Sequence, residues 1–233
     1  MRRRLLRAIL CFGLAIGAGA WPGRAAEPVA GGRFDKAVAG FAAADLKHPP
    51  PRAAILFVGS STFTQWKSLA QDFAPLPVIN RAFGGSTYAD LLHYLDRVVV
   101  PYAPRVVVVY AGDNDLAKPG TAAETVARQV AEFALRVRQA LPACRVLFVS
   151  IKPSPSRWAR WPEMSKANGL IREYAAAHDG LGYIDTTGTL LGADGTPDST
   201  LFLADRLHLN RQGYERWIAV MRPALDKAFQ EAH

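Results

Sequence analysis

The sequence RVVVVYAGDND, residues 105–115, decides the fold class of this chain. Its four consecutive valines, Val106 to Val109, are typical of a strand that is buried on both faces of a parallel sheet. Other short apolar runs occur along the chain, and longer segments with helical periodicity lie between most of them. This alternation predicts an α/β fold, in which helices cover both faces of the sheet as a three-layer α/β/α sandwich.

The apolar runs and the helical segments set the boundaries of the predicted elements. The predicted strands cover residues 53–58, 77–83, 105–110, 145–151 and 182–184. The predicted helices cover residues 33–46, 87–99, 121–140, 165–177 and 211–229. The helix over residues 121–140 has the clearest pattern, because Thr121 and Glu124 have the spacing of a capping box and an apolar stripe follows them.

The first residues have the pattern of a secretory signal. Three arginines at positions 2–4 precede an apolar run over residues 5–20, and small residues follow up to Ala26. The run is short for a membrane span, so we expect cleavage near Ala26 and an exported mature chain, periplasmic or secreted, with no stable membrane span. The alternative is that the segment stays attached as an anchor. The predicted organisation is a signal peptide over residues 1–26, an N-terminal helix and linker over 27–50, and the main domain over 51–233.

Removal of the predicted signal changes the charge and the cysteine count. With 23 basic and 20 acidic residues left, the formal net charge falls from +8 to +3. Nucleic-acid binding thereby loses its main compositional support, and we expect no such partner. Cys11 leaves with the signal, so Cys144 has no partner for an intramolecular disulfide.

Polar residues follow the first three predicted strands. They are GSST at residues 59–62, GGST at 84–87 and GDND at 112–115. In a parallel α/β sheet, ligands bind outside the carboxyl ends of the strands. A serine at a strand end gains exposure, a glycine allows the backbone to approach a ligand closely, and an asparagine amide can donate to an oxyanion. The three segments therefore predict one shared site.

A carboxylate and an imidazole lie three positions apart in Asp205-Arg-Leu-His208, before the last predicted helix. Of the five histidines, His48 lies in a Lys-His-Pro-Pro linker, His93 and His178 fall in helix-like stretches, and His233 is the last residue, which leaves His208 as the candidate base. An aspartate in this place can fix the imidazole tautomer and stabilise the imidazolium that forms during proton transfer. Taken alone, the pair also fits a surface ion pair or a helix cap. Together with the three strand-end segments it predicts the acid and base of a hydrolase triad.

These four segments, in this order, resemble those of the SGNH hydrolase family, also called GDSL-type esterases and lipases, over about residues 55–217. The resemblance implies a flavodoxin-like parallel sheet, no metal or other cofactor, and hydrolysis of carboxylic esters or thioesters through an acyl-enzyme. It makes residues 51–233 the hydrolase domain. An α/β-hydrolase is excluded, because residues 59–63 lack the Gly-x-Ser-x-Gly motif and Asp205 lies too close to His208 in the sequence.

The resemblance also assigns roles to single residues. It makes Ser61 the nucleophile, and it makes Asp205 and His208 the other two members of the triad. It places the oxyanion hole at the N–H groups of Ser61 and Gly85 and at the side chain of Asn114. The aspartate that usually precedes the nucleophile in this family is replaced by Ser60, which makes Ser60 a rival nucleophile on paper, although the register of the block favours Ser61.

The substrate is less well determined by the sequence. The segment after the fourth predicted strand carries Arg157, Trp158, Arg160 and Trp161, and the topology puts it at the rim of the site. One interpretation is that these side chains contact the substrate, by stacking on a sugar or by flanking an anionic head group. The alternative is that the tryptophans are buried and stabilise the loop, while the arginines are solvated. We expect a small or medium acyl ester, with a carbohydrate O-acetyl ester or a lysophospholipid as specialised alternatives. A carbohydrate- or lipid-binding protein without turnover is the alternative of another class.

Overall fold

The structure, a computed structural model, describes residues 32–232, so the predicted signal peptide and Cys11 lie outside the described residues. Among residues 32–232, none of the helices combines the length and the hydrophobicity that crossing a bilayer requires. Cys144 is buried with its thiol free, and burial raises the pKa of this thiol to about 12. We therefore expect it to be unreactive.

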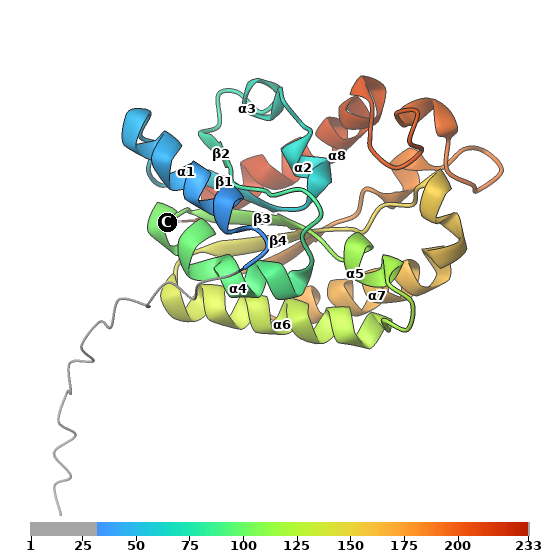
Figure 1. Cartoon of the computed structure of the whole chain (residues 1–233), viewed down its shortest axis with the longest axis horizontal. Helices are drawn as coiled ribbons and strands as arrows, with labels where there is room; N and C mark the ends of the chain where they lie inside the picture. Colours follow the sequence, from blue (N-terminus) through green and yellow to red (C-terminus); the bar gives the residue numbers. More distant parts are fainter. Residues whose placement is uncertain (1–31, 233) are drawn as a thin grey trace, which may run out of the picture. The chain divides into compact units, whose positions relative to one another are not determined.

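A single parallel sheet forms the centre of the described chain (Figure 1). Its strands are β1 (Ile55–Gly59), β2 (Val78–Asn80), β3 (Val106–Tyr110), β4 (Arg145–Val149) and β5 (Leu181–Ile184). They pair in the order β2-β1-β3-β4-β5, and every pair is parallel. This is the flavodoxin-like order, so the predicted fold class is confirmed.

Helices cover both faces of the sheet (Figure 1). One face carries α1 (Asp35–Lys47), α4 (Tyr88–Val98), α6 (Ala123–Ala140) and α7 (Trp161–Ala176). The other face carries α2 (Ser61–Thr64), α3 (Leu69–Asp72) and α8 (Arg211–Glu231). The short α5 (Asp113–Ala117) begins almost directly after β3, and four 3-10 turns cover Val100–Tyr102, Pro155–Arg160, Thr187–Leu190 and Ser199–Leu201.

The valine run of β3 is buried on both faces, as its sequence predicts. Val107 and Val109 point into the apolar cluster under α4, α6 and α7, whereas Val106 and Val108 point into the cluster under α8. All four valines are 0% exposed. Each buried valine contributes on the order of 1.5 kcal/mol, so this strand anchors both layers of helices.

Two sequence predictions about the helices are wrong. The capping box of Thr121 and Glu124 does not form, because α6 begins at Ala123 and Ala122 is its N-cap. The N–H of Ala123 instead donates to the Glu163 side chain of α7 over 2.6 Å. The α7 helix itself begins at Trp161 rather than near residue 165, since the proline that follows is well suited to the first turn of a helix.

Gly59 allows β1 and β3 to meet closely at their carboxyl ends. Its φ is +138°, and a Cβ at this position would lie 1.9 Å from the carbonyl oxygen of Tyr110. The carbonyl oxygen of Gly59 also accepts a hydrogen bond from the N–H of Phe83, at 2.9 Å. The last residue of β1 therefore contacts the last residue of β3 and the segment that follows β2, and only glycine fits there.

We predict that Gly59→Ala destabilises the domain by several kcal/mol, because the added Cβ overlaps backbone that cannot move without breaking the sheet. Gly169→Ala is the matched control, since it lies in the interior of α7 and its Cβ would meet nothing within 4 Å. This control is expected to stabilise the domain by about 0.5–1 kcal/mol. Urea unfolding of both variants measures the two effects, and equal stabilities would contradict the close-contact explanation.

Candidate active site

Ser61 lies where β1 turns into α2, as the first residue of that helix. The N–H of the preceding Ser60 donates to the carbonyl oxygen of Tyr110 over 3.0 Å, which continues the pairing of β1 with β3 by one residue. The side chain of Ser60 is 0% exposed, and its hydroxyl has no partner among the described residues. Ser61 is half-buried, and its Oγ lies 2.8 Å from Nε2 of His208. The structure thus separates the two serines that the sequence leaves as rivals.

His208 and Asp205 form a local unit in the turn before α8. The imidazole Nδ1 lies 2.5 Å from Asp205 Oδ2, so a proton on Nδ1 donates to the carboxylate and leaves Nε2 as the acceptor that faces Ser61. Asp205 Oδ1 accepts from the backbone N–H groups of Leu207 and His208, each at 2.9 Å. Although desolvation opposes ionisation, these hydrogen bonds lower the pKa of Asp205 to about 2. The carboxylate is therefore charged at any pH at which an imidazole titrates.

The segment after β2 lies beside Ser61. A Cβ on Gly84 would be 3.8 Å from the Cβ of Ser61, and both Gly84 and Gly85 are exposed. Gly85 has a φ of +82°, and among residues 32–232 the N–H groups of Gly85 and Ser61 donate to no other group. Asn114, in α5, donates from Nδ2 to the carbonyl oxygen of Ser86 over 3.0 Å. The predicted oxyanion donors are thus brought to the strand ends around Ser61.

An ion pair lies buried beneath this site. Lys152 is 1% exposed, and its Nζ lies 3.3 Å from Oδ2 of Asp113, which is 3% exposed. The ammonium also donates to Tyr110 Oη at 3.1 Å and to Thr62 Oγ1 at 3.2 Å. Burial lowers the pKa of Lys152, while Lys152 and Arg157 outweigh burial at Asp113 and lower the pKa of that carboxyl. The sequence did not predict this pair, because a lysine after a strand carries no signal of burial.

Arg157 joins this ion pair to the predicted oxyanion hole. Its NH1 lies 3.2 Å from Asp113 Oδ2, and its NH2 donates to Asn114 Oδ1 over 3.0 Å. The N–H of the adjacent Ser156 donates to the carbonyl oxygen of Arg206, within the turn that carries His208, over 3.0 Å. The 3-10 turn after β4 therefore touches both the oxyanion side and the acid–base side of the site.

The other residues that the sequence places at the rim have contacts within the protein. Arg160 donates to the carbonyl oxygens of Leu116 and Lys118, at 3.1 and 2.9 Å, and thereby closes the end of α5. The rings of Trp158 and Trp161 stack on each other with centroids 5.8 Å apart, and Trp161 also packs against the apolar core. Both tryptophans are half-buried, so each keeps part of its surface open to solvent.

The comparison with known proteins places this arrangement in a family. Residues 56–216 of the chain match the GDSL-like lipase/acylhydrolase family. The match includes the three strand-end segments and the Asp205–His208 turn, and it covers more than half of the chain.

The chain belongs to the GDSL-like lipase/acylhydrolase family. It is a GDSL-type hydrolase that acts on ester bonds. No curated protein matches the sequence at a significant level.

Solved structures of low sequence identity share the fold. A GDSL-like lipase from Bacteroides thetaiotaomicron is 19% identical with a TM-score of 0.69, and the match covers 82% of this chain and 98% of that one. A carbohydrate esterase of family 3 from Talaromyces cellulolyticus is 15% identical with a TM-score of 0.62, over 78% and 100% of the two chains. An acetylxylan esterase from Geobacillus stearothermophilus is 13% identical with a TM-score of 0.59, and the match covers 77% of this chain and 95% of that one.

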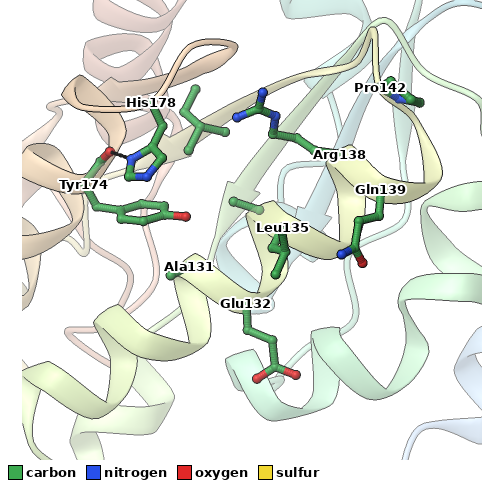
Figure 2. A pocket seen from close by; sticks show the side chains of 10 residues that line it. Ala131, Glu132, Leu135, Arg138, Gln139, Pro142, Tyr174 and His178 are labelled. Carbon is green, nitrogen blue, oxygen red and sulfur yellow. Dashed lines mark hydrogen bonds between the residues drawn. The ribbon is translucent and has the colours of Figure 1, made fainter. Parts of the chain in front are cut away.

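A cavity of about 580 Å³ lies away from Ser61 in this GDSL-family hydrolase (Figure 2). Leu135 and Arg138 line it from α6, Tyr174 lines it from the last turn of α7, and His178 lines it from just after that helix. Leu181, the first residue of β5, also lines it, so the cavity is at the amino end of that strand, whereas Ser61 follows the carboxyl end of β1. Among residues 32–232, no cluster of three or more His, Cys, Asp or Glu side chains is arranged to hold a metal ion.

Asp115 is a buried carboxyl next to Asn114, with 5% of its surface exposed. Its Oδ1 accepts from the N–H of Tyr88 at 3.0 Å, while its Oδ2 is buried without a partner among the described residues. Burial raises the pKa of Asp115 to about 6. Because the folded state then binds the proton more tightly than the unfolded state, stability from this residue is present below about pH 4 and is lost as the pH rises through 6.

We predict that Asp115→Asn raises the free energy of unfolding by about 2–3 kcal/mol above pH 7, and that the gain shrinks towards zero near pH 4. Asparagine keeps the acceptor for Tyr88 and removes the buried charge. Asp113→Asn is the matched control, and it is expected to destabilise the domain at neutral pH because it leaves Lys152 without its counter-ion. Urea unfolding at several pH values measures both effects, and a pH-independent gain for Asp115→Asn would refute the assignment.

Proposed function

We propose that this chain is a serine esterase in which Ser61, His208 and Asp205 form the catalytic triad. One observation carries the proposal: Ser61 Oγ lies 2.8 Å from His208 Nε2, and His208 Nδ1 lies 2.5 Å from Asp205 Oδ2. A nucleophile within hydrogen-bonding reach of a base, and a base oriented by a carboxylate, is the arrangement that acyl transfer to serine needs.

In the proposed reaction, Ser61 Oγ attacks the ester carbonyl carbon while His208 Nε2 takes the hydroxyl proton. Asp205 stabilises the imidazolium that results. The tetrahedral intermediate then expels the alcohol, which receives the proton from His208, and the acyl group stays on Ser61. Water attacks the acyl-enzyme in the same way, with His208 again as the base, and the carboxylic acid leaves.

The negative charge of each tetrahedral intermediate would be held by three donors. They are the N–H groups of Ser61 and Gly85, which are free among the described residues, and the second hydrogen of Asn114 Nδ2. Ser61 is the first residue of α2, where backbone N–H groups have no partner within the helix. Donors fixed before the reaction stabilise the oxyanion without the cost of reorganisation.

For the substrate, we propose a short acyl group, in particular acetyl, on a carbohydrate alcohol. Two of the structural relatives are a carbohydrate esterase and an acetylxylan esterase, which supports this choice. The exposed Gly84 and Gly85 beside Ser61 leave room for a bulky alcohol, and the half-buried Trp158 offers an aromatic face. An exported chain, as the signal pattern predicts, would meet such esters outside the cytoplasm.

We predict that a fluorophosphonate probe labels the wild-type protein and Ser60→Ala but not Ser61→Ala. The Ser60 hydroxyl is buried without a partner, so its loss leaves the site intact, whereas Ser61 is the residue that meets His208. Intact-protein mass spectrometry with peptide mapping locates the label. Labelling of Ser60 would reverse the assignment. A folded wild-type protein that takes no label would favour the non-catalytic binding protein.

We predict that kcat/KM on 4-nitrophenyl esters is highest for acetate and falls as the acyl chain lengthens, and that acetylated xylooligosaccharides release acetate. Ser61→Ala is the control for background hydrolysis in both assays. A maximum of kcat/KM at octanoate or a longer acyl chain, with release of fatty acid from lysophosphatidylcholine, would contradict the acetyl esterase and support a lysophospholipase.

A further inference from the structure

The amide of Asn114 can act as an oxyanion donor only in one of its two orientations. Nδ2 carries the two hydrogens, while Oδ1 can only accept, and the two atoms exchange places when the amide rotates by half a turn. An amide that populates both orientations presents its lone pairs to the oxyanion for part of the time. Catalysis by Asn114 therefore requires a partner that selects the correct orientation.

Arg157 and Ser86 both select the same orientation. The guanidinium of Arg157 has donors and no acceptor, and its NH2 lies 3.0 Å from Asn114 Oδ1. The backbone carbonyl of Ser86 can only accept, and it lies 3.0 Å from Asn114 Nδ2. In the rotated amide, donor would face donor at Arg157 and acceptor would face acceptor at Ser86. One hydrogen of Nδ2 is used by Ser86, so the second stays available to the substrate oxygen.

An ion pair supports Arg157 from below. Its NH1 lies 3.2 Å from Asp113 Oδ2, in a side chain that is 4% exposed, although NH1 makes no hydrogen bond among the described residues. Asp113 is in turn held by Lys152 and by the hydroxyl of Tyr110. The Arg157 side chain is itself only 19% exposed. Two cations, Lys152 and Arg157, thus share one buried carboxylate.

The guanidinium of Arg157 has a second effect on Asn114. A hydrogen bond from a cation to Oδ1 polarises the amide and makes its N–H groups stronger donors. The oxyanion that develops near Nδ2 is negative, so the same field stabilises it more than the neutral ester. Both effects favour the transition state over the bound substrate, and they are expected to change kcat more than KM.

We propose that Arg157 is a positioning residue of the oxyanion hole, which holds and polarises the Asn114 amide from the Asp113–Lys152 ion pair. The proposal rests on the proposed function of Asn114. It differs from the rim role that the sequence suggests, in which Arg157 would contact an anionic substrate directly.

A double-mutant cycle between Arg157 and Asn114 tests the proposal. Arg157→Met is expected to lower kcat on 4-nitrophenyl acetate by about 10- to 100-fold with little change in KM, and Asn114→Ala by about 100- to 1,000-fold. The double variant is expected to be no slower than Asn114→Ala alone, because Arg157 has nothing left to act through. Should Arg157→Met fail to fold, Arg157→Ala replaces it in the same cycle.

Arg136→Met is the matched control, since Arg136 also contacts a carbonyl oxygen, that of Leu92, and a carboxylate, that of Asp96, but from α6. It is expected to leave kcat unchanged. Three results would overturn the proposal: losses that multiply in the double variant, a raised KM with unchanged kcat, or an Arg157 variant with wild-type kcat. A folded wild-type protein that neither hydrolyses esters nor takes the fluorophosphonate label would instead overturn the proposed function, and this inference with it.

Discussion

The close backbone contact between Gly59 and Tyr110 is the constraint on which the rest of the site depends. It lets β1 and β3 pair up to their last residues, and the pairing continues through the N–H of Ser60. The carbonyl oxygen of Gly59 also receives the N–H of Phe83, so the segment after β2 is held at the same place. Ser61 then emerges as the first residue of α2, beside Gly84. A larger residue at position 59 would separate these backbones and with them the donors of the proposed oxyanion hole.

The second determinant is electrostatic. Burial of Lys152 and Asp113 costs several kcal/mol per ion unless they pair, and the hydroxyl groups of Tyr110 and Thr62 supply further partners. Such a pair adds little net stability compared with apolar residues, but it fixes positions. Through Arg157 it reaches Asn114, and through the backbone of Ser156 the same turn reaches the segment that carries His208. The ion pair is therefore better understood as a support for the site than as a source of stability.

The site also contains local costs to stability. The Ser60 hydroxyl and the Oδ2 atom of Asp115 are buried without partners among the described residues, and an unsatisfied buried polar group costs about 1–3 kcal/mol. Arg206 has a φ of 56°, which is uncommon for a residue with a side chain, and this turn allows Asp205 to accept from Leu207 and His208. Unfavourable local features of this kind concentrate where geometry is selected for function rather than stability.

Sequence patterns alone determined the parallel sheet, its five strands, and the segments that bear Ser61, Gly85, Asn114 and His208, because apolar runs and strand-end motifs are properties of neighbouring residues. The short range of such patterns also explains what they missed. The strand-end pattern alone does not separate Ser60 from Ser61, although the family resemblance favours Ser61. The burial of Ser60 and the contact of the half-buried Ser61 with His208 distinguish them. The cap that Glu163 provides for α6, the burial of Lys152 and the contact of Arg157 with Asn114 join residues about 40 or more positions apart. Only the tertiary structure decides which side chains meet over such separations, because each contact depends on how whole helices and strands pack.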